Sequence, residues 1–248
     1  MILRCIATGS SGNSYALIDG KSIMLLDLGV SAKEIKRAID FRISDVVGAV
    51  VTHQHQDHSK SVADFDKMGI QAFTPYSKGV SFKGEHEERI LTKYSNFVIA
   101  AFALTDLNGK WMHTNADGSE CPCYGFLIEH SELGRMLYIT DTELIKWKFR
   151  NINHILLGVN YDKDLLDNEN KSKRNHVYRG HLSIDTACEF VKCNSDSLET
   201  VIMCHLSDSN SDVDSFISKM KNAVPGANVF VAERGLEVPL SNKKCCPF

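Results

Sequence analysis

Short hydrophobic runs alternate with polar, glycine-containing stretches along most of the chain. Apolar, β-branched runs of this length are typical of buried strands. Ten such runs indicate two sheets rather than one. The predicted strands are residues 2–7, 15–18, 23–28, 46–51, 97–104, 124–128, 136–139, 155–159, 201–204 and 229–232.

A helical spacing of apolar residues occurs between several of these strands. The clearest helix is expected to begin at Ser31, which forms a capping box with Glu34 ahead of the amphipathic segment AKEIKRAI. Further helices are expected near residues 62–68, 184–192 and 213–221. Helices are thus interspersed with strands, which favours an α/β fold. Because no internal repeat or low-complexity linker is found, we expect residues 1–248 to form a single domain.

Composition narrows the class of protein without deciding its function. The chain has 248 residues, of which 43% are hydrophobic and 24% charged. Its apolar runs are strand-sized, far shorter than the roughly 20 residues that cross a bilayer, so we expect no membrane span and a cytoplasmic protein. No two of the eight cysteines have the C-x-x-C spacing of zinc ribbons, which favours free thiols.

A polar cluster begins where the buried run 46–51 (VVGAVV) ends. Within six positions it contains His53, His55, Asp57 and His58. Histidines at alternate positions can also form the outer face of a strand, but that reading explains only one pair. Loops at strand ends commonly carry chemistry, and imidazole with carboxylate is a ligand set for divalent metal ions. The cluster therefore predicts a metal site.

One short segment cannot complete two metal sites, so further ligands are expected downstream at other strand ends. Asp141 follows the run RMLYIT, and His205 follows VIMC. His113 stands in the loop after the strand expected at 97–104. Each of the three meets the same positional requirement.

These residues lie in motifs that resemble the metallo-β-lactamase superfamily over nearly the whole chain. Within it, the chain is most similar to the WalJ (YycJ) branch of nucleases, with tRNase Z a more distant relative. The motifs are GSSGN at 9–13, LLDLG at 25–29, THQHQDH at 52–58, YITDT at 138–142, GHLS at 180–183 and CHLSDSN at 204–210.

The resemblance implies a four-layer αββα sandwich, in which two mixed sheets are flanked by helices. It also implies two divalent metal ions, Zn²⁺ or Mn²⁺, at one edge of the sheets. The implied ligands are His53, His55 and His113 for one ion, Asp57, His58 and His205 for the other, and Asp141 as the bridge. Asp27 is expected to orient the histidine loop, although a purely structural role is an equal alternative.

The chain departs from the family pattern at one ligand. The family has a His-Asp pair directly after its fifth strand, and a direct count reaches Thr105 and Asp106 instead. His113 requires a local insertion, which a surface loop tolerates at little cost. We favour His113 because the pattern resumes after it, with Asp106 as the alternative.

Other residues are candidates for contact with substrate. Asp57 can orient the attacking water, and His181 in GHLS can donate a proton to the leaving oxygen. A surface histidine is the alternative for His181. It lies beyond a basic run formed by Lys171, Lys173, Arg174 and Arg179.

The GSSGN loop offers backbone N–H groups and the hydroxyls of Ser10 and Ser11, which can hold a phosphate oxygen. Asn13 and Arg179 complete the candidate substrate-binding set. Alone, this loop motif is weak and equally fits a tight turn.

The predicted activity is hydrolysis of a phosphodiester bond in nucleic acid, as a 5′→3′ exonuclease by resemblance. The net charge of −3 suits a cyclic or short nucleotide as the alternative substrate. A lactamase- or thioesterase-type hydrolase and a metal-free binding protein are the other classes. The sequence leaves a homodimer open.

Overall fold

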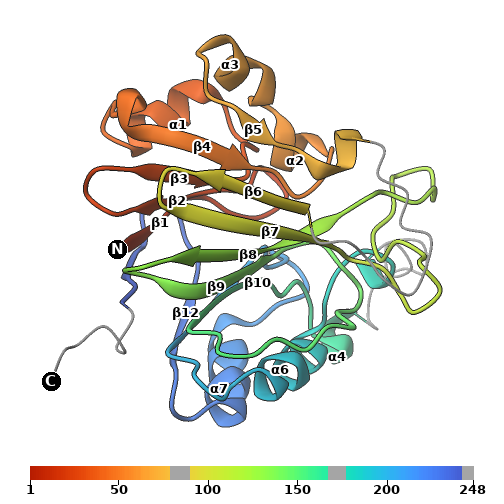
Figure 1. Ribbon diagram of the computed structural model, residues 1–248. Helices are drawn as coiled ribbons and strands as arrows, with labels where there is room; N and C mark the ends of the chain where they lie inside the picture. The colour runs from red at the N-terminus through yellow and green to blue at the C-terminus, as the bar shows by residue number, and fades with distance from the viewer. Residues whose placement is uncertain (79–89, 167–176, 242–248) are drawn as a thin grey trace, which may run out of the picture.

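Two β-sheets lie face to face, with helices over the outer face of each (Figure 1). This computed structural model describes residues 1–78, 90–166 and 177–241. The layers run helix, sheet, sheet, helix, so the expected α/β fold of the metallo-β-lactamase type, αββα with two mixed sheets, is confirmed.

The first sheet has the strand order β13-β1-β2-β3-β4-β5. It is mixed, because β13, β1, β2 and β3 pair antiparallel, whereas β3, β4 and β5 pair parallel. Its strands are β1 (Ile2–Ala7), β2 (Ser14–Ile18), β3 (Ile23–Leu26), β4 (Val46–Val50), β5 (Ala72–Phe73) and β13 (Glu237–Pro239).

The second sheet has the order β12-β11-β10-β9-β8-β7-β6. The strands from β12 to β9 are parallel, and those from β9 to β6 are antiparallel. Its strands are β6 (Ile90–Tyr94), β7 (Phe97–Ala103), β8 (Tyr124–His130), β9 (Gly134–Ile139), β10 (His154–Gly158), β11 (Thr200–Cys204) and β12 (Asn228–Val231).

Helices α1, α3, α6 and α7 form where the sequence predicts them, whereas the one-turn helices α2 and α4 were not predicted. The capping box of Ser31 and Glu34 opens α1, as expected. Ser183 caps α6 and Asp212 caps α7 through their side-chain oxygens. The helices are α1 (Ala32–Ala38), α2 (Gln56–Ser59), α3 (Val62–Lys67), α4 (Lys163–Leu166), α6 (Ile184–Cys193) and α7 (Val213–Ala223), with 3₁₀ turns at Ile43–Asp45 and Pro75–Lys78.

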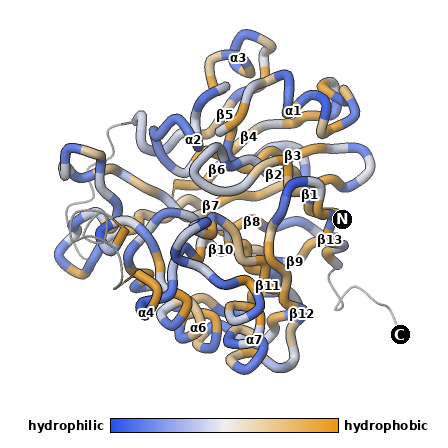
Figure 2. Tube along the Cα trace, turned by 180° about the vertical axis from the view of Figure 1, so that it is seen from behind, coloured by the Kyte–Doolittle hydropathy of each residue, from blue (hydrophilic) through white to orange (hydrophobic). Residues whose placement is uncertain are grey.

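Burial of apolar side chains holds the four layers together. Leu17 and Val50 of the first sheet pack against Phe126, Tyr138 and Ile202 of the second in the central core. Separate apolar clusters join α1 and α3 to the first sheet, and α6 and α7 to the second. Figure 2 shows hydrophobic residues along the strands and more polar residues on the outer helices. Both sheets are therefore buried on both faces.

All ten predicted strands are present, and β5, β6 and β13 are additional. The strand expected at 23–28 ends at Leu26, because Asp27 has a positive φ of 54° that leaves the extended conformation. The six cysteines within the described residues are free thiols, as expected. Among the described helices, none has the length and hydrophobicity needed to span a bilayer.

Candidate metal centre

The candidate ligand side chains gather at the edge where strands of both sheets end. The histidine cluster 53–58 follows β4 of the first sheet. Asp141 follows β9, and His205 follows β11, both in the second sheet. Because β9 and β11 run parallel with β10 between them, their carboxyl ends meet at the same edge.

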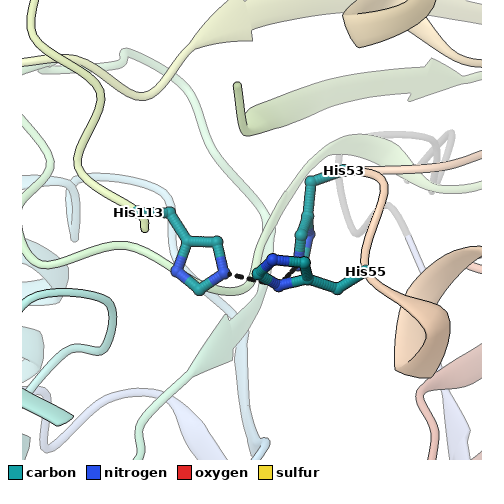
Figure 3. A group of neighbouring side chains, drawn as sticks. All are labelled: His53, His55 and His113. Carbon is teal, nitrogen blue, oxygen red and sulfur yellow. Dashed lines mark hydrogen bonds between the residues drawn. The ribbon is translucent and has the colours of Figure 1, made fainter. Parts of the chain in front are cut away.

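Three histidines point toward one another in the first ligand group, as Figure 3 shows. The Nδ1 atom of His55 lies 3.2 Å from Nε2 of His53 and 3.0 Å from Nε2 of His113. Nitrogen ligands about 2.05 Å from one tetrahedral ion would be about 3.3 Å apart. The three nitrogens are therefore spaced as ligands of a common ion would be.

His113 reaches this group because the chain makes a hairpin after β7. The N–H of Met112 donates to the carbonyl of Leu104 at 2.9 Å, so residues 105–111 form a loop whose two ends are hydrogen-bonded to each other. Asp106 belongs to the turn of that hairpin: its carboxylate accepts the N–H groups of Asn108 and Lys110. Of the two candidates for this position, the geometry brings His113, and not Asp106, to His53 and His55.

The second ligand group consists of Asp57, His58, Asp141 and His205. Oδ2 of Asp141 lies 3.3 Å from Nε2 of His58, and its Oδ1 lies 3.5 Å from Nε2 of His205. The same Oδ2 is 3.7 Å from Nε2 of His53, which belongs to the first group. Asp141 thus stands between the two groups, where a bridging ligand has to stand.

The donor set fits divalent metal ions. Oδ1 of Asp141 and Nε2 of His205 are buried, face each other, and have no hydrogen-bond partner among the described residues. Buried polar atoms without partners are costly, and a cation between them would satisfy both. Nitrogen and carboxylate oxygen together suit Zn²⁺ and Mn²⁺.

Protonation differs between the two groups in the metal-free protein. Burial lowers the pKa of His113 to about 3, so its nitrogen is neutral and ready to bind a cation. Burial alone would also lower the pKa of His58, but the carboxylates of Asp27 and Asp141 raise it well above its ordinary value. Burial acts to raise the pKa of Asp141, yet His205 and His58 hold it well below the usual range. A cation at the second group would therefore displace a proton from His58.

Asp27 lies behind the histidine loop and contacts it directly. Its carboxylate accepts the backbone N–H of Thr52 at 2.8 Å and contacts Nδ1 of His58 at 2.5 Å. It also accepts the Tyr138 hydroxyl at 2.6 Å, which joins the two sheets. These contacts match the expectation that Asp27 orients the loop. The sequence alone does not predict that Thr52 and Tyr138 bind Asp27, although both residues lie within the motifs of the resemblance.

The GSSGN loop packs beside the ligand helix α2. Asn13 is fully buried, and its side-chain amide forms hydrogen bonds with the backbone of Gly9. Its Nδ2 lies 3.1 Å from Nε2 of His58. These contacts favour a role for Asn13 in holding the loop and His58 in place over contact with substrate. A Cβ atom at Gly29 would collide with the carbonyl oxygen of Asp57, so only glycine permits this packing. Ser10 and Ser11 are exposed and line a cleft of about 970 Å³.

His181 lies at the mouth of the centre. Its Nδ1 is 3.6 Å from Oδ1 of Asp141, its ring stacks on His205 with centroids 5.3 Å apart, and its side chain is 14% exposed. Nδ1 of His113 lies 3.1 Å from the carbonyl of Gly180, which holds the GHLS segment in place. Arg179 is exposed beside it, whereas the rest of the expected basic run, Lys171, Lys173 and Arg174, lies outside the described residues.

Comparison with known proteins agrees with the fold and the site. Residues 7–98 match the model of the metallo-beta-lactamase superfamily, a region that includes GSSGN, LLDLG and the histidine cluster. The αββα layers and the two ligand groups agree with this match, so the chain resembles the hydrolases of the metallo-β-lactamase superfamily in fold and in candidate site.

The chain is also similar to particular proteins, one by sequence and two by fold. The chain is 23% identical over 225 residues to the exodeoxyribonuclease WalJ of Streptococcus pneumoniae serotype 2, covering 83% of this chain and 81% of the relative. The fold is similar to that of YhfI, a metallo-β-lactamase fold protein from Bacillus subtilis, with a TM-score of 0.64, 14% identity and coverage of 96% and 98%. It is also similar to the short form of human tRNase Z, with a TM-score of 0.61, 12% identity and coverage of 98% and 100%.

Proposed function

We propose that this chain is a metal-dependent phosphodiesterase that cleaves nucleic acid as a 5′→3′ exonuclease. The main support for this proposal is the position of the Asp141 carboxylate between the two ligand groups. A centre of two metal ions is suited to in-line displacement at phosphorus. Likeness to an exodeoxyribonuclease over most of both chains supports the choice of substrate. Zn²⁺ and Mn²⁺ are the proposed ions.

The proposed chemistry divides among a few side chains. When bound, the two ions would lower the pKa of water and neutralise charge on the phosphate. Asp57, whose side chain is 26% exposed, would orient the attacking water. His181 would donate a proton to the leaving oxygen. Ser10, Ser11 and Arg179, all exposed, would hold the substrate backbone.

A cyclic or short nucleotide is the second candidate substrate. The net charge is −3, and the described residues that line the cleft beside Ser10 and Ser11 include Asp208 and Glu233 but no lysine or arginine. A long polyanion draws much of its affinity from basic contacts to phosphate. This cleft therefore suits a neutral nucleoside moiety better than a run of phosphates.

The deciding experiment uses protein loaded with Zn²⁺ or Mn²⁺ and DNA labelled at either end. A 5′→3′ exonuclease releases the 5′ label at once, shortens the 3′-labelled strand progressively and leaves covalently closed circles intact. RNA and a panel of cyclic nucleotides are tested in parallel. The Asp141→Ala variant, prepared identically, controls for contaminating nucleases. Turnover of cyclic nucleotides alone would transfer the proposal to the second candidate.

A further inference from the structure

The loop that supplies His113 continues into a second small hairpin. Asn115 N–H donates to the Ser119 carbonyl at 2.8 Å, and Cys121 N–H donates to the His113 carbonyl at 3.0 Å. Asn115 therefore sits two residues beyond one histidine of the first ligand group. Its side chain reaches back to another, because its Oδ1 lies 3.0 Å from Nε2 of His55.

The hairpin itself fixes which end of the Asn115 amide faces His55. Nδ2 of Asn115 donates to Oγ of Ser119 at 2.9 Å and to the carbonyl of Glu120 at 3.2 Å. The Ser119 hydroxyl proton is already given to Asp117, at 2.6 Å, so Oγ is available only as an acceptor there. Both partners of Nδ2 are acceptors, and Oδ1 must be the atom that points at His55.

An amide oxygen can only accept a hydrogen bond, so Nε2 of His55 has to carry the proton. In a neutral imidazole the other nitrogen, Nδ1, then keeps its lone pair. This is the atom that lies 3.2 Å from Nε2 of His53 and 3.0 Å from Nε2 of His113. The hydrogen-bond chain Asp117–Ser119–Asn115–His55 thus ends on a lone pair directed into the ligand group.

The other two histidines of the group have their Nδ1 atoms held from outside the group, in contrast to His55, which is held at Nε2. Nδ1 of His53 lies 3.0 Å from Oγ1 of Thr52, and Nδ1 of His113 lies 3.1 Å from the carbonyl of Gly180. Both turn Nε2 inward. His55 alone must present Nδ1, and the contact that selects this tautomer comes from the inserted loop.

We propose that Asn115 is a positioning residue for the first ligand group, and that it holds His55 as the Nε2–H tautomer so that Nδ1 faces the ion. The loop after β7 would then contribute twice, through the side chain of His113 and through the orientation of His55. The inference rests on the proposed metal centre, not on the identity of the substrate.

The test measures the two stepwise Zn²⁺ affinities by competition with a chromophoric chelator. Asn115→Leu keeps the size of the side chain but loses the acceptor, so one affinity should fall by about 10–100-fold, as for other outer partners of metal ligands. Asn115→Asp keeps an acceptor for His55 but loses the bonds to Ser119 and Glu120, and should stay within about threefold of the unaltered protein. Asn108→Leu, the same replacement in the neighbouring hairpin, is the matched control and should change neither affinity.

Equal losses in Asn115→Leu and Asn115→Asp would mean that Asn115 only closes its own hairpin. Unchanged affinities in Asn115→Leu would equally overturn the proposal. Two-bond ¹⁵N–¹H correlation spectra of the Zn²⁺-loaded protein give a second reading, in which His55 should carry its proton on Nε2. A proton on Nδ1 would contradict the assignment. Neither measurement involves substrate, so a protein that binds Zn²⁺ as expected but cleaves no nucleic acid would disprove the proposed function alone.

Discussion

His181 lies beside the candidate metal centre but is not one of its candidate ligands. It contacts the Asp141 carboxylate at 3.6 Å and stacks on His205, yet it comes from neither ligand group. The Ser183 cap of α6 and the Tyr161–Ser183 bridge fix the segment just after it. A partly exposed imidazole held beside the reacting centre is suited to proton transfer rather than to holding a cation.

Replacing His181 by Ala should keep both metal ions and lower turnover of a nucleic acid substrate by about 10²- to 10⁴-fold. The loss should shrink for a substrate with a p-nitrophenolate leaving group, since a stable anion departs without a proton. Steady-state rates on both substrates, with metal content measured on the same sample, check this. Equal losses on both substrates would assign His181 to phosphate binding, and no loss on either would make it a surface histidine.

At the scale of elements, the loop between β7 and β8 contributes His113, the one candidate ligand that departs from the family spacing. The family spacing predicts a histidine directly after β7, and the chain instead has Thr105 and Asp106 there. The hairpin at 105–111 returns the chain to the end of β7. His113 therefore lies at the position where the family spacing predicts the ligand. A direct count of residues misses this hairpin, but the return of the family pattern after His113 predicts a local insertion, and the Met112–Leu104 hydrogen bond closes it.

A pair of variants tests this assignment. His113→Ala should weaken the first metal site by more than about 100-fold, since loss of an outer partner alone commonly costs 10–100-fold. Asp106→Ala should leave metal content unchanged, because its carboxylate accepts backbone N–H groups of its own turn and belongs to neither ligand group. Metal analysis after gel filtration distinguishes the two. The reverse outcome would transfer the ligand role to Asp106.

Sequence patterns predict the central strands of the two sheets better than the strands at the sheet edges. All three strands that were missed, β5, β6 and β13, lie at sheet edges. An edge strand pairs on one side and needs fewer apolar residues, and β6 alternates half-buried with exposed positions. β13 is defined by pairing with β1, more than 200 residues away, which no local pattern records. The ligand cluster was predictable because its strand is continuously apolar.

At the scale of the whole molecule, the centre joins the two sheets. The first sheet supplies the histidine cluster after β4, and the second supplies His113, Asp141 and His205. The Asp27–Tyr138 hydrogen bond crosses the same boundary. A cation held by both sides would therefore add a link between two layers that are already joined by apolar packing and by hydrogen bonds such as this one.

The chain should bind two divalent ions, and each should raise its thermal stability. A ligand at 100 times its Kd stabilises the native state by about 2.7 kcal/mol, or about 5–10 °C in a chain of this size. Calorimetry of metal-free and Zn²⁺-loaded protein, with metal analysis after saturation, measures both quantities. One ion or fewer per chain, or an unchanged melting temperature, would count against a centre of two ions.

The order in which the ligands occur along the chain has a consequence for biosynthesis. The first ligand group spans residues 53–113, but the second is incomplete until His205 has been made and β11 has entered its sheet. A nascent chain that ends before this point lacks one wall of the centre. A stalled or truncated product without His205 would therefore have an incomplete second ligand group, and we expect it to lack metal-dependent hydrolysis.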